Sequence, residues 1–304
     1  MKAFLLSIFI LNTLLSNLCP QNEVKKSYYS DGQLKSIQNY YNGKLDNESR
    51  YYYETGILKE IVNYRDGRKN GISSSFSEKG ILHESINYVD DKFNGEFRTF
   101  HDNGALHEVG IYKDGVFNDA YKTYYESGEL KSEYFFVNGD KSGIARDYYR
   151  HGVTKAEAAY QGNLQNGITK WFYESGKLKG IYNYIGGNLH GEIKEFYENG
   201  SLMSRKNYLY GKLDSISNEY YENGQIKVES NFSSGYREGI TKSYYENGKL
   251  WTEQNYKKDI LVGETKIYRS DSSLWYIETY ENGKLILSKE YSDTGILVEE
   301  KKLR

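Results

Sequence analysis

The chain has 304 residues, of which 27% are charged, and a formal net charge of −2. This balance excludes a protein that holds nucleic acid or an anionic membrane mainly through a positive surface. A single cysteine, Cys19, excludes an internal disulfide and a zinc site built from several cysteines. The 33 tyrosines, 30 glycines and one proline favour β-strands joined by many turns, because tyrosine suits strands and proline interrupts their pairing.

Residues 1–19 differ in composition from the rest of the chain. Lys2 is followed by a mostly apolar stretch, residues 3–15, which is short for a membrane span and typical of a signal peptide. We therefore expect an exported protein, either periplasmic, on the outer surface or secreted. A plain cleaved signal is favoured. The alternative is a lipoprotein signal that leaves Cys19 as a lipid-anchored first residue, although residues 16–18 (SNL) depart from the lipoprotein pattern.

From residue 24 onward one pattern recurs every 24 residues. Two aromatic residues precede a polar turn with a glycine, and leucine or isoleucine follows two residues later, as in residues 244–250 (YYENGKL). Positions are counted from this turn glycine, which is position 0. The turn glycines are Gly32, Gly56, Gly80, Gly104, Gly128, Gly152, Gly176, Gly200, Gly224 and Gly248, continued by Ser272 and, one residue early, by Gly295. Such a regular period is the signature of a repeat protein.

Apolar residues recur at three positions of the repeat. Position −4, represented by Tyr244, is aromatic in every copy, and position +2 is leucine or isoleucine except at Thr154. Position +8 is tyrosine or phenylalanine from Tyr40 to Tyr280. Because positions +2 and +8 differ by an even number, we expect them on one face of a strand. Together with position −4 they are predicted to form the buried stripe.

Two further glycine columns follow, one about 11 residues after the turn glycine and one a few residues later. Each repeat is therefore predicted as strand, glycine-bearing loop, strand and tight turn, which leaves no room for the crossovers of a parallel sheet. The predicted fold is all-β: an elongated antiparallel meander of about twelve 24-residue β-hairpin repeats over residues 24–304, forming an open, twisted repeat sheet of about two dozen strands. A compensated slip of the glycines predicts an irregularity near residues 150–165.

The recurring phrase resembles the MORN repeat variant. Residues 197–202 (YENGSL) through 210–212 (YGK) are a good example, and the resemblance covers roughly residues 24–300. It implies an array of β-hairpins and, since similar bacterial chains are described as antitoxin-like, a bacterial antitoxin-like binder. Classical arrays of this kind are associated with membrane or protein scaffolding. Their enzymatic members carry an attached catalytic domain that this sequence lacks, so we expect neither catalytic activity nor a cofactor.

Histidines offer one candidate metal site. His83 and His107 occupy position +3 of successive repeats, and His101 lies on the strand between them. Three adjacent strands would then present three imidazoles on one face, roughly 5 Å apart per strand step, which suits a transition metal. The alternative, which we favour, is that variable surface positions hold these histidines by coincidence and bind no metal.

Other chemistry-bearing patterns are explained by the repeat itself. Glutamate recurs at position −2 of the hairpin turn, from Glu54 to Glu246, which indicates a role in the turn and in solubility. The glycines serve turns and form no phosphate-binding loop, dinucleotide fingerprint or nucleophile elbow. These patterns therefore indicate no active site.

The second aromatic of the phrase, at position −3, is the main candidate for a binding surface. It is expected on the face opposite position −4 and to be partly exposed, because four copies replace it. A ladder of tyrosine rings offers a large contact area to a partner, whereas the alternative is cross-strand packing that stabilises the sheet. The candidate binding residues are Tyr125, Tyr149, Tyr173, Tyr197, Tyr221 and Tyr245.

These features favour a non-enzymatic interaction or scaffold protein that binds an unidentified protein partner through an extended tyrosine-rich sheet face. The alternative is an exported cell-surface or cell-wall protein that binds a glycan or a lipid headgroup through its aromatic hairpins. Nucleic acid is not expected as a partner. The predicted export conflicts with a cytoplasmic antitoxin, and the composition of residues 1–19 is the stronger evidence.

Overall fold

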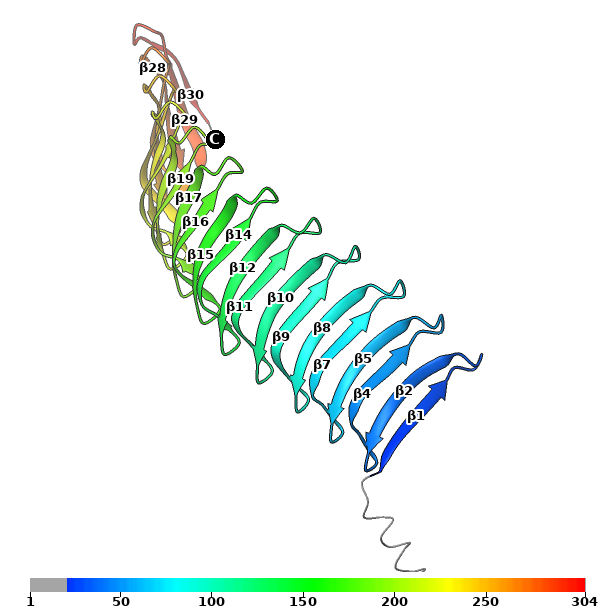
Figure 1. Ribbon diagram of the computed structural model, residues 1–304. Helices are drawn as coiled ribbons and strands as arrows, with labels where there is room; N and C mark the ends of the chain where they lie inside the picture. The colour runs from blue at the N-terminus through cyan, green and yellow to red at the C-terminus, as the bar shows by residue number, and fades with distance from the viewer. Residues whose placement is uncertain (1–20, 304) are drawn as a thin grey trace, which may run out of the picture. The chain divides into compact units, whose positions relative to one another are not determined.

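The structure, a computed structural model, describes residues 21–303. The predicted signal peptide and Cys19 lie outside these residues. The described residues divide into two compact units, residues 21–140 and residues 141–303. Within each unit the described residues form strands that pair antiparallel with their neighbours in sequence order (Figure 1). The predicted all-β meander of hairpin repeats is confirmed.

The strands of the first unit follow one another along the chain. They are β1 (Asn22–Tyr28), β2 (Leu34–Tyr41), β3 (Lys44–Leu45), β4 (Asn47–Tyr52), β5 (Leu58–Arg65), β6 (Arg68–Lys69), β7 (Gly71–Phe76), β8 (Leu82–Val89), β9 (Lys92–Phe100), β10 (Leu106–Lys113), β11 (Val116–Tyr124) and β12 (Leu130–Val137). The two-residue strand β13 (Asp140–Lys141) straddles the division between the units.

The second unit continues the same alternation of strands. They are β14 (Gly143–Tyr148), β15 (Thr154–Gln161), β16 (Leu164–Phe172), β17 (Leu178–Ile185), β18 (Asn188–Leu189), β19 (Gly191–Phe196), β20 (Leu202–Leu209), β21 (Lys212–Leu213), β22 (Ser215–Tyr220), β23 (Ile226–Ser233), β24 (Tyr236–Tyr244), β25 (Leu250–Lys257), β26 (Ile260–Leu261), β27 (Gly263–Tyr268), β28 (Leu274–Glu281), β29 (Lys284–Tyr291) and β30 (Leu297–Lys302). Six of the 30 strands in the described residues are two-residue segments, which leaves the two dozen long strands that the repeat predicts.

Two kinds of tight turn close the hairpins. At position 0 the N–H of Gly32 donates to the carbonyl of Tyr29 at 3.1 Å, and Gly32 has a φ of 87°. At positions +10 and +11 both residues have positive φ, which defines the type I′ turn of two-residue hairpins. The prediction of an irregularity near residues 150–165 is wrong. Gly162 and Asn163 both adopt positive φ, as the two turn residues of the other repeats do, and only the order of asparagine and glycine is reversed.

A β-bulge in every hairpin changes which residues share a face. Tyr52 pairs with Leu58, but its neighbour Tyr51 pairs with Glu60, so one extra residue lies between the two pairs. Since paired residues share a face and successive residues alternate, Leu58 and Glu60 point to opposite faces. The same shift occurs just before position −4 in all twelve hairpins. The predicted stripe is therefore wrong: positions −4 and +2 lie on one face and position +8 lies on the other.

The two faces of the sheet differ in packing. The packed face carries positions −7, −5, −3, +4, +6 and +8, and the open face carries positions −8, −6, −4, +2, +5 and +7. Every deeply buried residue of the described chain lies at position −7, +4 or +6 of the packed face. Val62 (1% exposed) and Ile193 (2% exposed) are examples. Most of these residues are serine, threonine or alanine. Position −4, predicted to be buried, is turned to the open face by the bulge and is half-buried, or 58% exposed at Tyr28.

Small residues are needed in the core because large rings lie over them. A Cβ atom added at Gly180 would come within 2.6 Å of the Tyr182 ring. One added at Gly110 would come within 2.8 Å of the Tyr121 ring. The core of this single-layer sheet is thus a stripe of small side chains covered by aromatic neighbours on the same face.

Candidate functional site

The tyrosines at position −3 connect their own hairpin to the following one. The hydroxyl of Tyr173 donates to the backbone carbonyl of Phe196 at 2.7 Å, 23 residues further along the chain. The same bond, at 2.6–2.8 Å, joins Tyr29 to Tyr52, Tyr53 to Phe76, Tyr149 to Phe172, Tyr197 to Tyr220, Tyr221 to Tyr244 and Tyr245 to Tyr268. Tyr125 is half-buried, as are the other five candidate binding tyrosines. The hydroxyls of those five are engaged within the sheet, which supports the stabilising alternative for this column.

Two of the four substitutions at position −3 preserve a bond to the next hairpin. His101 replaces tyrosine and places its Nε2 3.1 Å from the carbonyl of Tyr124. Arg269 donates from Nη2 to the carbonyl of Tyr291 at 2.6 Å. The variation at His101 and Arg269 therefore has a structural explanation, since both are long side chains with an N–H donor.

The rings at position −3 are also covered by the residue at position +3. A lysine ammonium lies 5.4–5.8 Å from the ring centre in six pairs: Lys35 and Tyr29, Lys59 and Tyr53, Lys131 and Tyr125, Lys155 and Tyr149, Lys179 and Tyr173, Lys227 and Tyr221. At Arg269 and Trp275 the two roles are exchanged, with the guanidinium 5.2 Å from the indole. These cation–π contacts leave less of each ring free for a ligand.

The candidate histidines do not assemble into a metal site. The rings of His101 and His107 are in contact, with centroids 4.3 Å apart. His107 Nδ1 lies 3.5 Å from the hydroxyl of Thr99. Within residues 21–303 no group of three His, Cys, Asp or Glu residues has a geometry that could hold a metal ion, so His83 does not complete the predicted ligand set.

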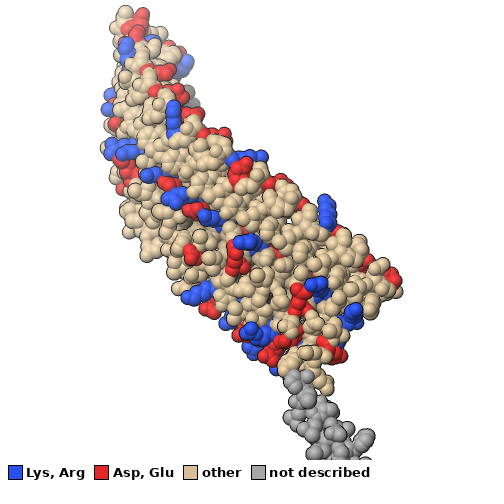
Figure 2. All heavy atoms as spheres, in the orientation of Figure 1, with Lys and Arg blue, Asp and Glu red and all other residues tan. Residues whose placement is uncertain are grey.

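The open face carries exposed aliphatic residues among charged ones. Position −8 holds valine or isoleucine, 46–59% exposed, in six repeats: Val24, Ile72, Ile144, Ile168, Ile216 and Ile240. Position −6 holds lysine or arginine in ten of the twelve repeats: Lys26, Arg50, Arg98, Lys122, Arg146, Lys170, Lys194, Lys242, Lys266 and Lys289. In the view of Figure 2, cationic and anionic side chains are interspersed with wide areas of other residues.

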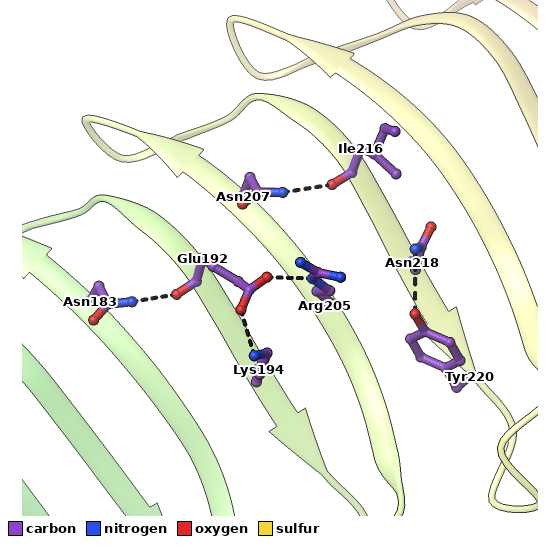
Figure 3. A network of polar contacts seen from close by, with 8 residues as sticks. All are labelled: Asn183, Glu192, Lys194, Arg205, Asn207, Ile216, Asn218 and Tyr220. Atoms are coloured by element: carbon purple, nitrogen blue, oxygen red, sulfur yellow. Dashed lines mark hydrogen bonds and ion pairs between the residues drawn. The ribbon is translucent and has the colours of Figure 1, made fainter.

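Asparagines at position +7 fix the backbone beside the exposed aliphatic residues. Asn183 donates from Nδ2 to the carbonyl of Glu192 at 2.5 Å, and Asn207 donates to the carbonyl of Ile216 at 3.1 Å (Figure 3). Both acceptors stand at position −8 of the next repeat, directly after a residue with positive φ. The side-chain amide thus supplies a donor where the bulged backbone leaves the regular ladder. The recurring Asn-Tyr at positions +7 and +8 is the sequence signal from which this role could have been predicted.

A polar network crosses the open face of the second unit, from β19 through β20 to β22 (Figure 3). Lys194 Nζ lies 2.6 Å from Oε1 of Glu192, and Arg205 Nε donates to Oε2 of the same carboxylate. The hydrogen bond from Lys194, helped by Arg205, lowers the pKa of Glu192 below its usual range. Beside Arg205 lies a hollow of about 290 Å³ lined by Arg205, Asn207, Ser215, Ile216 and Asn218.

We expect the stability of the second unit to depend on pH through Glu192. Because its pKa is lower in the folded protein, the stabilisation is fully present above about pH 4.5 and is lost as the pH falls through the folded-state pKa. Urea unfolding followed between about pH 6 and pH 3 should therefore show a smaller acid-induced loss for Glu192→Gln than for the wild type. Glu222→Gln, in an exposed hairpin turn, is the control, and an equal effect of both substitutions would contradict this role of Glu192.

Two tight turns per repeat, a bulge in every hairpin and side-chain bonds from most hairpins to the next define a β-hairpin repeat protein. The model of the MORN repeat variant matches residues 24–42, 45–66, 93–114, 120–138, 165–185, 189–210, 213–233 and 237–258, which is more than half of the chain. The chain belongs to the MORN repeat variant family. This repeat-sheet fold fits a repeat-based binding or scaffold protein. No described residue belongs to a helix that is long and apolar enough to cross a membrane.

Comparison with other known proteins adds weak similarities. No curated protein matches the chain. Among solved structures, the crystal structure of TcdB2-TccC3-TEV is 12% identical, over 89% of this chain and 18% of that one, with a TM-score of 0.19. The Photorhabdus luminescens Tc holotoxin pore is also 12% identical, over 90% of this chain and 18% of that one, with a TM-score of 0.19. The chain thus spans less than a fifth of the length of these structures.

Proposed function

We propose that the protein is a non-enzymatic scaffold that binds a partner protein through the open face of its sheet. The observation that carries this proposal is the row of exposed valine and isoleucine at position −8, which occurs in both units. Recurrent exposed apolar side chains rimmed by polar residues mark interaction surfaces, because leaving them in water is unfavourable. The half-buried aromatic residues at position −4 lie on the same face, so the tyrosine-rich binding face of this proposal includes Tyr244 instead of Tyr245.

The packed face has a structural role, which leaves the open face for binding a partner. Its aromatic rings cover the small residues of the core, and the position −3 side chains of most repeats bond to the following hairpin. Changes on that face would disturb the fold, whereas position −8 already varies between isoleucine and glutamate, as at Ile216 and Glu192. A face whose residues vary without disturbing the fold can adapt to a partner.

Site-specific photo-crosslinking in cells that produce the full chain tests the proposal. A photoreactive amino acid at Ile168 or Ile216, on the open face, is expected to give a discrete adduct with one protein. The photoreactive amino acid placed at Lys177, in an exposed hairpin turn, is the control and is expected to give no adduct. An adduct that forms equally from Lys177, or one that contains a glycan or lipid and no polypeptide, would refute the proposal in favour of another surface or ligand.

A further inference from the structure

Arg205 and Asn218 depart from the residue pattern of the open face. At position +5 the other repeats hold isoleucine, valine, glutamate or, at Ser85, serine, and Arg205 is the one arginine there in the described chain. Asn218 stands at position −6, where ten repeats hold lysine or arginine. These two residues are directly paired across β20 and β22. The corresponding pair across β17 and β19 is Ile181 with Lys194.

These departures create a hollow with unused hydrogen-bonding groups. An asparagine is shorter than a lysine, and the hollow of about 290 Å³ lies over Asn218 and Ile216. The Oδ1 of Asn218 is buried and has no hydrogen-bond partner among the described residues, while its Nδ2 lies 3.4 Å from the hydroxyl of Tyr220. An unpartnered acceptor of this kind favours a ligand that supplies an N–H donor.

The charge of the site favours an anionic ligand. Glu192 is shared by Lys194 and Arg205, so one carboxylate faces two cations. The bond to Glu192 uses Nε of Arg205, and a guanidinium carries four further N–H donors that suit a second carboxylate. Glu229 lies opposite Asn218 on the next strand, one strand farther from Arg205. Its negative charge limits the place of an incoming carboxylate to the Arg205 side of the hollow.

A related hollow lies on the open face of the first unit. It has a volume of about 370 Å³ and is lined by Ile72, Ser85, Asn87, Glu96 and Arg98. Here too an arginine is paired with a short polar residue, Ser85 with Arg98, next to an exposed isoleucine and a position +7 asparagine. Glu96 engages both Nε and Nη2 of Arg98, at 3.0 and 2.8 Å, which leaves this arginine fewer free donors than Arg205.

We propose that the Arg205 hollow binds an extended acidic segment of the partner protein. A carboxylate of the segment pairs with the guanidinium of Arg205, a backbone N–H donates to Oδ1 of Asn218, and a neighbouring aliphatic side chain packs on Ile216. This proposal rests on the proposed function and names the chemistry of the partner. The related hollow at Arg98 binds the same kind of segment more weakly.

Binding of a capped peptide of alternating valine and glutamate, measured by isothermal titration and by NMR of the Asn218 side-chain amide, tests the proposal. Arg205→Ile and Asn218→Lys each introduce the residue of the Ile181–Lys194 pair, so both variants are expected to fold as the wild type does. Each should weaken binding of the peptide at least tenfold, about 1.4 kcal/mol. The same peptide with glutamine in place of glutamate should bind the wild type at least tenfold more weakly.

The control variant Ile181→Val changes the same position in another repeat and should leave peptide binding unchanged. Glu229→Gln should strengthen binding, because it removes a like charge beside the ligand carboxylate. Equal binding of the glutamate and glutamine peptides, no peptide binding by the wild type, or full binding by Arg205→Ile would overturn the proposal. If the photo-crosslinked adduct persists in Arg205→Ile, the open-face function stands and only this assignment of the acidic segment fails.

Discussion

Replacing the five tyrosines at position −3 of the second unit by phenylalanine is expected to lower its free energy of unfolding by about 5 kcal/mol, about 1 kcal/mol for each lost hydroxyl. The five residues are Tyr149, Tyr173, Tyr197, Tyr221 and Tyr245. Each substitution keeps the ring but removes the donor that binds a backbone carbonyl of the next hairpin. In a repeat array these contacts between neighbours supply much of the stability, because no single hairpin buries a core.

Urea unfolding followed by circular dichroism measures this effect, first for Tyr173→Phe alone and then for the combined variant. The matched control is Tyr244→Phe at position −4, where phenylalanine already stands in four repeats, for example at Phe172 and Phe196. The control should change the unfolding midpoint little. A loss of stability at Tyr244 as large as that at Tyr173 would show that the hydroxyl bonds between hairpins are not what the position −3 tyrosines contribute.

Replacing Thr169, Thr241 and Thr265 by valine is expected to stabilise the second unit by about 3 kcal/mol, about 1 kcal/mol at each position. These threonines stand at position −7 of the packed face and are at most 4% exposed. Their hydroxyls have no hydrogen-bond partner among the described residues. Valine has nearly the same shape and removes the buried polar atom, so desolvation no longer opposes folding.

The chain itself shows that position −7 accepts apolar side chains, since Ala145 and Ile193 occupy it in other repeats. The matched control is Ser204→Ala, which removes a buried hydroxyl that does have a partner, the carboxylate of Glu195 at 2.6 Å. This control should destabilise the protein. Thermal unfolding of each single and combined variant decides the matter, and a lower midpoint for the threonine variants would contradict the expected gain.

The repeat, the antiparallel pairing and the two turns in each repeat could be predicted, because the spacing of the glycines indicates where the chain turns. Gly32 and Gly43 adopt the positive φ that their columns indicate. The distribution of residues between the faces could not be predicted from even and odd spacing, because the bulge inserts one residue between positions +2 and +4. A bulge has no fixed sequence signature, and one extra residue reverses every later side chain of the strand.

The candidate site was predictable to a smaller extent. The column of tyrosines at position −3 is visible in the sequence, but the bond from Tyr173 to a carbonyl 23 residues away depends on the distance between neighbouring hairpins. The pairing of Arg205 with Asn218 likewise requires the register across β20 and β22. Comparison of the columns alone would have marked both residues as exceptions, without showing that they meet.

The central claim is that the open face binds the partner while the packed face stabilises the fold. Its most direct test compares capture of the partner by two variants that carry a photo-crosslinker at Ile240 on the open face. The first variant combines Ile168→Glu with Ile216→Glu, which introduces at position −8 the glutamate that Glu192 already provides there. It should abolish the protein adduct, while the unfolding midpoint stays within about 2 °C of the wild type. The second variant combines Tyr173→Phe with Tyr197→Phe on the packed face. It should lower the unfolding midpoint by several degrees and keep the adduct. Loss of the adduct in the tyrosine variant at a temperature where it is folded, with retention in the isoleucine variant, would contradict the proposal.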